Sequence, residues 1–129
     1  AMKAAIENGY NVCIISGGSN DGVRTRLKNL GITDIHLGVS NKVEIYKAFT
    51  DINNIQPQEV LYMGDDIPDF WVMQEVGLPT CPQDAAPEIK KISKYISHVN
   101  GGKGAVRDVI EQVMKVQGKW LEHFNAKFD

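Results

Sequence analysis

The sequence lacks a long apolar run, a cysteine pair at metal-binding spacing and a marked excess of either charge. A membrane-spanning helix needs ~20 consecutive apolar residues. No stretch of the chain approaches that length, and no signal peptide is visible at its start. The formal net charge of -2 provides no broad basic surface for nucleic acid. We therefore expect a cytoplasmic protein that binds neither membranes nor nucleic acids.

The cysteines and glycines also exclude two common kinds of site. Cys13 and Cys81 both lie in apolar segments and have no CxxC spacing, so we interpret them as buried free thiols of a reducing compartment. No GxGxxG sequence follows any apolar segment, which leaves a dinucleotide-binding fold without support.

Short apolar segments alternate with amphipathic ones along the 129 residues, a length that suits a single domain. Strands that alternate with helices over short connections form a parallel sheet covered on both faces. The sequence thus predicts an α/β fold with a three-layer, Rossmann-like arrangement. The expected strands cover 11–16, 34–39, 59–64, 78–82 and 94–99; the expected helices cover the residues before Gly9, then 23–30, 41–52, 69–76, 85–92 and 104–116.

Three of the expected helices carry apolar residues at helical spacing, and we expect each of these stripes to face the core. Ser40 or Asn41 precedes the second of these helices, where either side chain can cap it. The stripes consist of Val23, Leu27 and Leu30; of Ile45, Phe49 and Ile52; and of Val106, Val109, Ile110 and Val113.

The two ends of the chain depart from the regular alternation. The opening segment AMKAAIENGY has the pattern of the last turns of an amphipathic helix, so we expect that something upstream is missing. Residues 121–129 place aromatic residues among charges and are expected to form a C-terminal tail that packs on its own domain or on a neighbour.

Polar residues of three kinds follow three of the predicted strands. The first strand ends at 16–18 (Ser-Gly-Gly), the second leads to Lys42, and the third leads to Asp65, Asp66 and Asp69. Ligands of open α/β sheets bind beyond the carboxyl ends of the strands. Carboxylate oxygens hold Mg²⁺, and a lysine with hydroxyl or amide donors neutralises phosphoryl oxygens. Each feature alone is common, so it is their joint order that predicts a phosphate site.

This order resembles the haloacid dehalogenase-like phosphatase superfamily, in which a hydroxyl residue, a lysine and a GDxxxD segment are signature motifs. The segments SNK, GDDIPD and GGKGAVR, with the sequence around them, resemble its 3-deoxy-D-manno-octulosonate 8-phosphate phosphatase family through about Trp120. The resemblance implies a phosphatase domain over residues 1–120 without a separate cap domain. It also implies hydrolysis of that sugar-acid phosphate, a step in lipopolysaccharide precursor synthesis.

The resemblance implies roles for the acidic residues and the lysine. Asp65 would ligate Mg²⁺, and Asp66 would lie in the second shell or contact the metal through water. Lys42 would hold the phosphoryl group and balance the charge of an aspartate nucleophile. Asp69 would orient Lys42.

It also implies contacts to the phosphate and to the sugar acid. Ser16 and the amide of Gly17 would donate hydrogen bonds to phosphate oxygens. Arg26 and Lys3 would contact the substrate, which carries a carboxylate as well as a phosphate. Arg107 is interpreted as an ion-pair partner rather than a catalytic residue.

Two departures from the family pattern stand out. Gly18 occupies a place where the family commonly has an arginine, and no Asp-x-Asp sequence occurs anywhere in the chain. In the family that motif follows a central strand and supplies the nucleophile of an aspartyl-phosphate mechanism. We therefore expect that this first strand is missing and that the 129 residues alone have little or no activity. The family is typically tetrameric, so we expect a homo-oligomer.

Two other interpretations stay open. Because Gly18 replaces an arginine, the substrate could be another sugar-acid phosphate, such as a nine-carbon 9-phosphate. The missing Asp-x-Asp also leaves a non-catalytic phosphate- or metal-binding domain, for example a subunit that works with a sugar-activating enzyme. A response-regulator receiver is disfavoured, because its acidic pair comes first and its lysine last, the reverse of the order found here.

Overall fold

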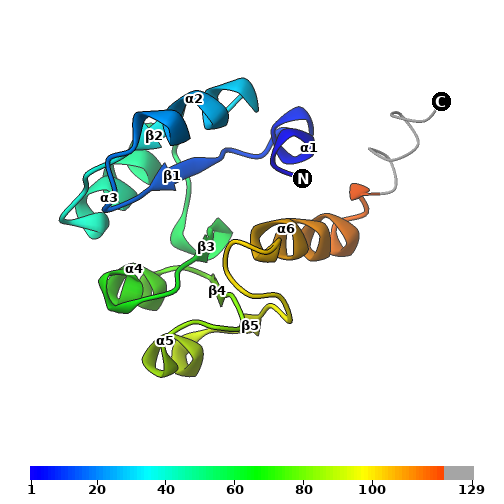
Figure 1. Cartoon of the computed structure of the whole chain (residues 1–129). Helices are drawn as coiled ribbons and strands as arrows, with labels where there is room; N and C mark the ends of the chain where they lie inside the picture. Colours follow the sequence, from blue (N-terminus) through cyan, green and yellow to red (C-terminus); the bar gives the residue numbers. More distant parts are fainter. Residues whose placement is uncertain (121–129) are drawn as a thin grey trace.

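The computed structural model describes residues 1–120, and its strands and helices follow the predicted order (Figure 1). The expected tail at 121–129 lies outside the described residues. The strands are β1 Cys13–Ile15, β2 Asp34–His36, β3 Leu61–Met63, β4 Leu78–Cys81 and β5 Tyr95–Ile96. The helices are α1 Met2–Glu7, α2 Asp21–Asn29, α3 Lys42–Ile52, α4 Phe70–Glu75, α5 Pro87–Ile92 and α6 Ala105–Val116, with short 3-10 turns η1 Pro57–Glu59 and η2 Ile67–Asp69.

The strands pair in parallel, which confirms the predicted α/β class. They form two sheets rather than one: β1 pairs with β2, and the other three strands follow the order β3-β4-β5. Ile14 lies opposite Ile35 in the first sheet, and Tyr62 lies opposite Pro79 in the second. Within residues 1–120, β1 and β3 each pair on one side only. Figure 1 shows that β1 and β3 are the strands that face each other across the division between the sheets.

The strands that border this division are apolar but poorly covered. All residues of β1 and of β3 are only partly buried, whereas three of the four residues of β4 are buried. A wholly apolar run is typical of a parallel strand covered on both faces and paired on both sides. The partial burial of β1 and β3 is therefore consistent with a missing neighbour between them.

Helices α3 and α4 join the two sheets across one face. Tyr46 of α3 packs with Val72 and Val76, which lie in and directly after α4, in one buried cluster. Ile15 of β1 and Tyr62 of β3 both pack against this cluster. The hydrophobic contacts of the helical layer thus connect strands that share no hydrogen bonds.

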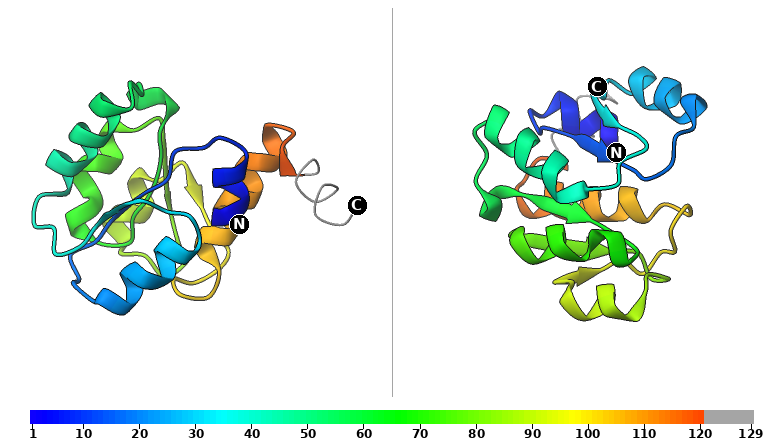
Figure 2. Two further views of the ribbon diagram at one scale, coloured as in Figure 1. Left: turned by 90° about the horizontal axis from the view of Figure 1, so that it is seen from above. Right: turned by 90° about the vertical axis from the view of Figure 1, so that its left-hand side faces the viewer.

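The opposite face is covered by the first and last helices. Ala4 and Ala5 of α1 form a buried cluster with Met114 of α6, against which Tyr10 and Val12 also pack. Figure 2 shows α3 and α4 on one side of the strands and α1 and α6 on the other. Helices therefore cover both faces, as the sequence predicted.

The cap of α3 was predicted correctly, but its buried face was not. The side chain of Asn41 accepts a hydrogen bond from the backbone N–H of Glu44 at 3.3 Å. Ile52, placed in the apolar stripe, is 83% exposed, and the buried residues are Tyr46 and Thr50. The hydroxyl of Thr50 donates to the carbonyl of Tyr46 at 3.1 Å, so this polar residue is satisfied within the helix and can face the core.

Two other apolar stripes are corrected: α2 has no buried residue, and the stripe of α6 is exposed at its start. Leu30 follows the last turn of α2 and is exposed, and Val106 in the first turn of α6 is exposed as well. Ala105, Val109 and Met114 are the buried apolar residues of α6. In each case the outermost residue of the predicted stripe lies at a helix end.

Three further sequence expectations can be checked. Cys13 and Cys81 are both free, Cys81 being buried and Cys13 partly buried. Arg107 forms an ion pair with Glu111 at 2.8 Å, as expected. Among residues 1–120, no helix has both the length and the apolar character needed to cross a membrane.

A buried carboxylate ties β5 to α6. Asp108 accepts a hydrogen bond from the Tyr95 hydroxyl at 2.7 Å, and its other oxygen lies 3.4 Å from Gln112 Nε2 and 3.7 Å from His98 Nδ1. Burial alone would raise the pKa of Asp108, but the hydrogen bonds from Tyr95, Ser97 and Gln112 and the nearby His98 hold it below its usual value. The ionised form of Asp108 therefore stabilises this end of the fold.

Replacing Asp108 by Asn should lower the free energy of unfolding by roughly 1–3 kcal/mol near neutral pH, because a buried charged acceptor is lost. Folding lowers the pKa of Asp108, so its contribution is complete above the unfolded value, about 3.9. The contribution disappears as the pH falls through the folded value. In urea unfolding, the difference between the two proteins should be smaller near pH ~3 than near pH ~7.

The matched control for this experiment is Arg107→Gln, which breaks an exposed i,i+4 pair in the same helix. It should cost about 0.5 kcal/mol or less. An Asp108→Asn effect that stayed constant between the two pH values would contradict the assignment of an ionised, stabilising Asp108.

Candidate functional site

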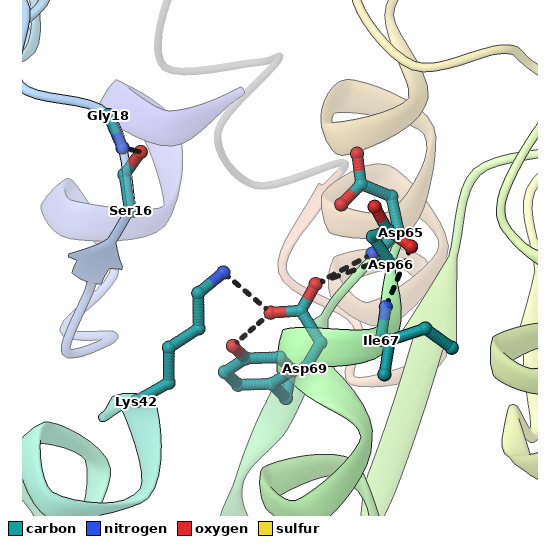
Figure 3. A network of polar contacts seen from close by, with 8 residues as sticks. Ser16, Gly18, Lys42, Asp65, Asp66, Ile67 and Asp69 are labelled. Atoms are coloured by element: carbon teal, nitrogen blue, oxygen red, sulfur yellow. Dashed lines mark hydrogen bonds and ion pairs between the residues drawn. The ribbon is translucent and has the colours of Figure 1, made fainter. Parts of the chain in front are cut away.

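The predicted site residues follow the carboxyl ends of β1, β2 and β3. Ser16 comes directly after β1, Lys42 begins α3 after β2, and Asp65 lies two residues after β3. Figure 3 shows Lys42 between the Ser16 loop and the segment from Asp65 to Asp69. The structure therefore brings these stretches of chain into one region, at the division between the two sheets.

An ion pair between Lys42 and Asp69 forms the centre of this region. Lys42 Nζ lies 2.9 Å from Asp69 Oδ1, and the two side chains are 14% and 4% exposed. A charge pair this deeply buried is stable only when the remaining oxygen positions are also satisfied. The pairing agrees with the orienting role that the family resemblance implied for Asp69.

Asp69 accepts hydrogen bonds at both of its oxygens. Oδ1 accepts from Lys42 Nζ and, at 2.6 Å, from the hydroxyl of Tyr62. Oδ2 accepts from the backbone N–H groups of Asp65 at 3.0 Å and Asp66 at 3.3 Å. Burial alone would raise the pKa of Asp69, but these donors, led by Lys42 and Tyr62, hold it below its usual value. Asp69 is therefore a buried, ionised carboxylate that connects three segments of the chain.

Tyr62 is the member of this network that the sequence did not single out. It lies in β3 among aliphatic neighbours, in the segment VLYMG. The one feature of the sequence that could have pointed to Tyr62 is its hydroxyl in an otherwise apolar strand. A buried tyrosine usually has a hydrogen-bond partner for its hydroxyl. That signal does not identify the partner.

Gly64 allows Asp69 to approach the end of β3. A Cβ atom at position 64 would lie 2.5 Å from Cβ and 2.7 Å from Cγ of Asp69, and 2.8 Å from Sδ of Met73. These distances are too short for any side chain. The glycine of the GDDIPD segment is therefore required by the position of Asp69.

Gly64→Ala should lower the free energy of unfolding by roughly 1–3 kcal/mol, because the added methyl group overlaps Asp69 and Met73. Gly18→Ala is the matched control, since its Cβ would meet Ser16 Oγ at an ordinary 3.6 Å. It should change stability by less than about 0.5 kcal/mol. Thermal or urea unfolding measures both, and equal stability of the two variants would show that position 64 has room for a side chain.

Asp65 and Asp66 are both exposed but differ in their contacts. Asp66 Oδ1 accepts from the N–H of Ile67 at 2.8 Å and so caps the turn η2. The carboxyl group of Asp65 is partly desolvated by the surrounding protein, and this is the main cause of its raised pKa. The charges of Asp69 and Asp66 raise the pKa further, while Lys42 opposes them. Asp65 thus presents a carboxylate in a region with surplus negative charge.

A cavity of about 410 Å³ opens beside Asp65. Its lining residues are Asp65, Asp66, Asp84, Ala86 and Gly101. Asp84 accepts a hydrogen bond from the N–H of Gly101 at 2.8 Å, which links the two loops that form one wall. Asp84 was not among the residues selected from the sequence.

The donor atoms at this cavity have the hard oxygen character that Mg²⁺ requires. Within residues 1–120, however, no group of three or more His, Cys, Asp or Glu side chains is close enough to hold a metal ion. Asp65 therefore fits as one ligand of a Mg²⁺ ion, and further ligands would have to come from another segment, from water or from substrate.

The Ser16 loop is held by backbone hydrogen bonds to the segment after β2. Ser16 N–H donates to the carbonyl of His36, and Ser16 O accepts from the N–H of Val39, both at 2.9 Å. The hydroxyl oxygen of Ser16 accepts from the N–H of Gly18 at 3.1 Å, so its proton is left for another acceptor. Gly17, between them, is exposed.

The structure does not bring Arg26 or Lys3 into this network. Arg26 is exposed on α2, and no hydrogen bond or ion pair of the described residues connects it with Lys42 or Asp65. Lys3 is exposed on α1, which packs beside α6 and precedes β1, whereas Ser16 follows β1 (Figure 1). Their roles toward substrate stay predictions.

Comparison with known proteins agrees with this arrangement. The sequence profile of the haloacid dehalogenase-like hydrolase family matches residues 32–110, which include Lys42, Asp65 and Asp69. The chain belongs to this family. It is 36% identical over 118 residues to the 3-deoxy-D-manno-octulosonate 8-phosphate phosphatases of Salmonella typhi and Escherichia coli K12. These matches cover 92% of the chain and 63% of each relative, so the chain spans less than two thirds of their length.

Solved structures of similar proteins share the fold. The 3-deoxy-D-manno-octulosonate 8-phosphate phosphatase of Yersinia pestis superposes with a TM-score of 0.90 at 34% identity, over 92% of this chain and 64% of that one. The phosphatase of the same description from Moraxella catarrhalis, in complex with magnesium ion, phosphate ion and a KDO molecule, gives 0.92 at 32% identity, over 99% and 73%. The described elements thus match a large part of these folds.

Proposed function

We propose that this chain supplies the phosphate- and metal-binding part of a phosphatase that hydrolyses 3-deoxy-D-manno-octulosonate 8-phosphate to the free sugar acid and phosphate. The observation that carries the proposal is the Lys42–Asp69 ion pair, which is held beside Asp65 at the carboxyl ends of the strands. The names of the curated relatives and the ligands of the Moraxella catarrhalis structure support the choice of substrate.

Lys42 would bind the phosphoryl group with an ammonium that is already oriented. Asp69 Oδ1 occupies one of the three donor positions of Lys42 Nζ and fixes its direction. The remaining N–H groups are then free to donate to phosphoryl oxygens, whose negative charge grows during transfer. The free hydroxyl proton of Ser16 and the amide of Gly17 would donate to other oxygens of the same group.

Mg²⁺ would be held by Asp65, with Asp66 contributing through water. When bound, the ion would offset negative charge on the phosphoryl oxygens and on the surrounding carboxylates. This fits the local charge, since Asp65, Asp66 and Asp69 face one lysine in the network. The magnesium in the Moraxella catarrhalis structure supports the choice of metal.

The nucleophile would have to come from a segment that these residues do not contain. The family resemblance implies an aspartate that follows a central strand and forms an aspartyl-phosphate, and the chain has no Asp-x-Asp sequence. The unpaired sides of β1 and β3 provide a place for such a strand. A strand there would end beside Ser16 and Lys42, where the phosphoryl group is expected.

The residues of the chain also bear on the substrate and on the oligomeric state. Gly18 stands where an arginine is common, so a related sugar-acid phosphate with nine carbons is the second candidate. We also infer a homo-oligomer, the tetramer of the family resemblance. Exposed apolar side chains at Ile67 and Trp71, close to the acidic segment, are consistent with a covered surface there.

The proposal predicts different behaviour for the chain alone and for the same chain with an Asp-x-Asp strand restored upstream. The 129 residues alone should release no phosphate from 3-deoxy-D-manno-octulosonate 8-phosphate at an enzymatic rate, because the covalent step lacks its nucleophile. The restored protein should turn the substrate over in the presence of Mg²⁺, and Lys42→Met should lower kcat/KM by about 100-fold or more. Phosphate release measured with the eight-carbon and nine-carbon substrates in parallel identifies the sugar.

Arg107→Gln serves as the matched control in the restored protein, since Arg107 is exposed and paired with Glu111. It should leave kcat/KM unchanged. A restored protein that binds inorganic phosphate but releases none from either substrate would contradict the phosphatase and favour the non-catalytic phosphate-binding domain. Ordinary turnover by the 129 residues alone would contradict the missing-nucleophile part of the proposal.

A further inference from the structure

The hydroxyl of Tyr62 has a specific connection to the proposed phosphate site. It donates to Asp69 Oδ1 at 2.6 Å, and Lys42 Nζ approaches the same oxygen atom at 2.9 Å. Because both donors converge on one atom, the place of that atom depends on Tyr62 as well as on Lys42. Asp69 Oδ2 is used by backbone N–H groups and cannot take over either bond.

The ring of Tyr62 is itself well fixed. It lies in β3 and packs against two buried clusters, one centred on Tyr46, Val72 and Val76 and the other including Met73 and Ile89. A rigid ring aims its hydroxyl more accurately than a long flexible side chain does. Lys42, with its four-carbon stem, would otherwise have many rotamers open to it.

We propose that Tyr62 is a positioning residue, which fixes Asp69 Oδ1 and through it holds the Lys42 ammonium in the direction of the phosphoryl group. This inference rests on the proposed function, in which Lys42 binds phosphate. Tyr62 touches neither substrate nor metal in this assignment. Burial and the hydrogen bond to Asp69 raise the pKa of Tyr62, so the phenol keeps its proton and stays a donor.

Loss of the hydroxyl should affect turnover more than substrate binding. Without the Tyr62 hydroxyl, the Asp69 carboxylate can rotate and the Lys42 ammonium can move with it. The ammonium then no longer meets the phosphoryl oxygens in the geometry of the transition state. In the protein with the upstream strand restored, Tyr62→Phe should lower kcat by roughly tenfold. KM should change by less than about twofold.

Tyr46 offers a matched control in the same part of the fold. It lies in the cluster against which Tyr62 packs, and its buried hydroxyl has no hydrogen-bond partner among the described residues. Tyr46→Phe removes the same atom without breaking a bond, so kcat should stay unchanged and stability should be equal or higher. A loss of activity in both variants would show a general effect on packing and overturn the positioning role.

A double-mutant cycle separates positioning through Lys42 from any other role of Tyr62. In a Lys42→Met background there is no ammonium for Asp69 to position, so adding Tyr62→Phe should change kcat by less than about twofold. The same roughly tenfold loss in both backgrounds would overturn the proposal. So would an unchanged kcat for Tyr62→Phe alone.

A second measurement does not depend on phosphatase activity and therefore distinguishes failure of this inference from failure of the proposed function. An amine-acylating reagent, followed by mass spectrometry, reports how freely the Lys42 ammonium moves, with exposed Lys115 on α6 as the internal reference. Tyr62→Phe should raise labelling of Lys42 relative to Lys115, and Tyr46→Phe should not. Equal relative labelling in all three proteins would overturn the positioning of Lys42 even if the enzyme were active.

Discussion

The site depends on one buried carboxylate whose oxygens are all engaged. An ionised Asp69 whose side chain is 4% exposed would be very costly without partners, yet it accepts from an ammonium, a phenol and two backbone N–H groups. These donors come from α3, from β3 and from the turn after β3. The same hydrogen bonds that make the charge tolerable therefore fix the position of Lys42 and the path of the backbone at Asp65. Stability of the fold and geometry of the site have one common cause here.

The hydrophobic layer explains how this arrangement persists across two separate sheets. Ile15 from one sheet and Tyr62 from the other pack against the same buried cluster of Tyr46, Val72 and Val76. Side-chain packing on α3 and α4 therefore connects the two sheets, which share no strand pairing. The Lys42–Asp69 pair lies at the N-terminal ends of these two helices, because Lys42 begins α3 and Asp69 immediately precedes α4. The polar and apolar contacts between these two helices thus support each other.

Within the haloacid dehalogenase-like hydrolase family, we propose that the chain supplies the electrostatic part of a phosphate site. Such a site would bind a phosphoryl group through a lysine, a hydroxyl and a carboxylate that holds a metal ion, but a covalent step would also need a nucleophile. The strands β1 and β3 are half-buried and border the division between the sheets. Their partial burial is consistent with a missing strand between them, and the absence of an Asp-x-Asp sequence indicates the same missing strand. Two independent observations, one chemical and one structural, are therefore consistent with the missing strand and nucleophile that we propose.

The sequence by itself determined the α/β class and the order of the elements, and it narrowed the cap of α3 to Ser40 or Asn41, because periodicity, β-branched runs and capping residues act over a few neighbouring positions. It also placed Ser16, Lys42 and Asp65 at the carboxyl ends of strands. Only the tertiary structure decided that Ile52 is exposed, that the sheet is divided, and that Tyr62 and Lys42 share one oxygen of Asp69. Those features depend on contacts between residues distant in sequence, Lys42 and Asp69 being 27 positions apart, and local pattern carries no information about which distant side chains will meet.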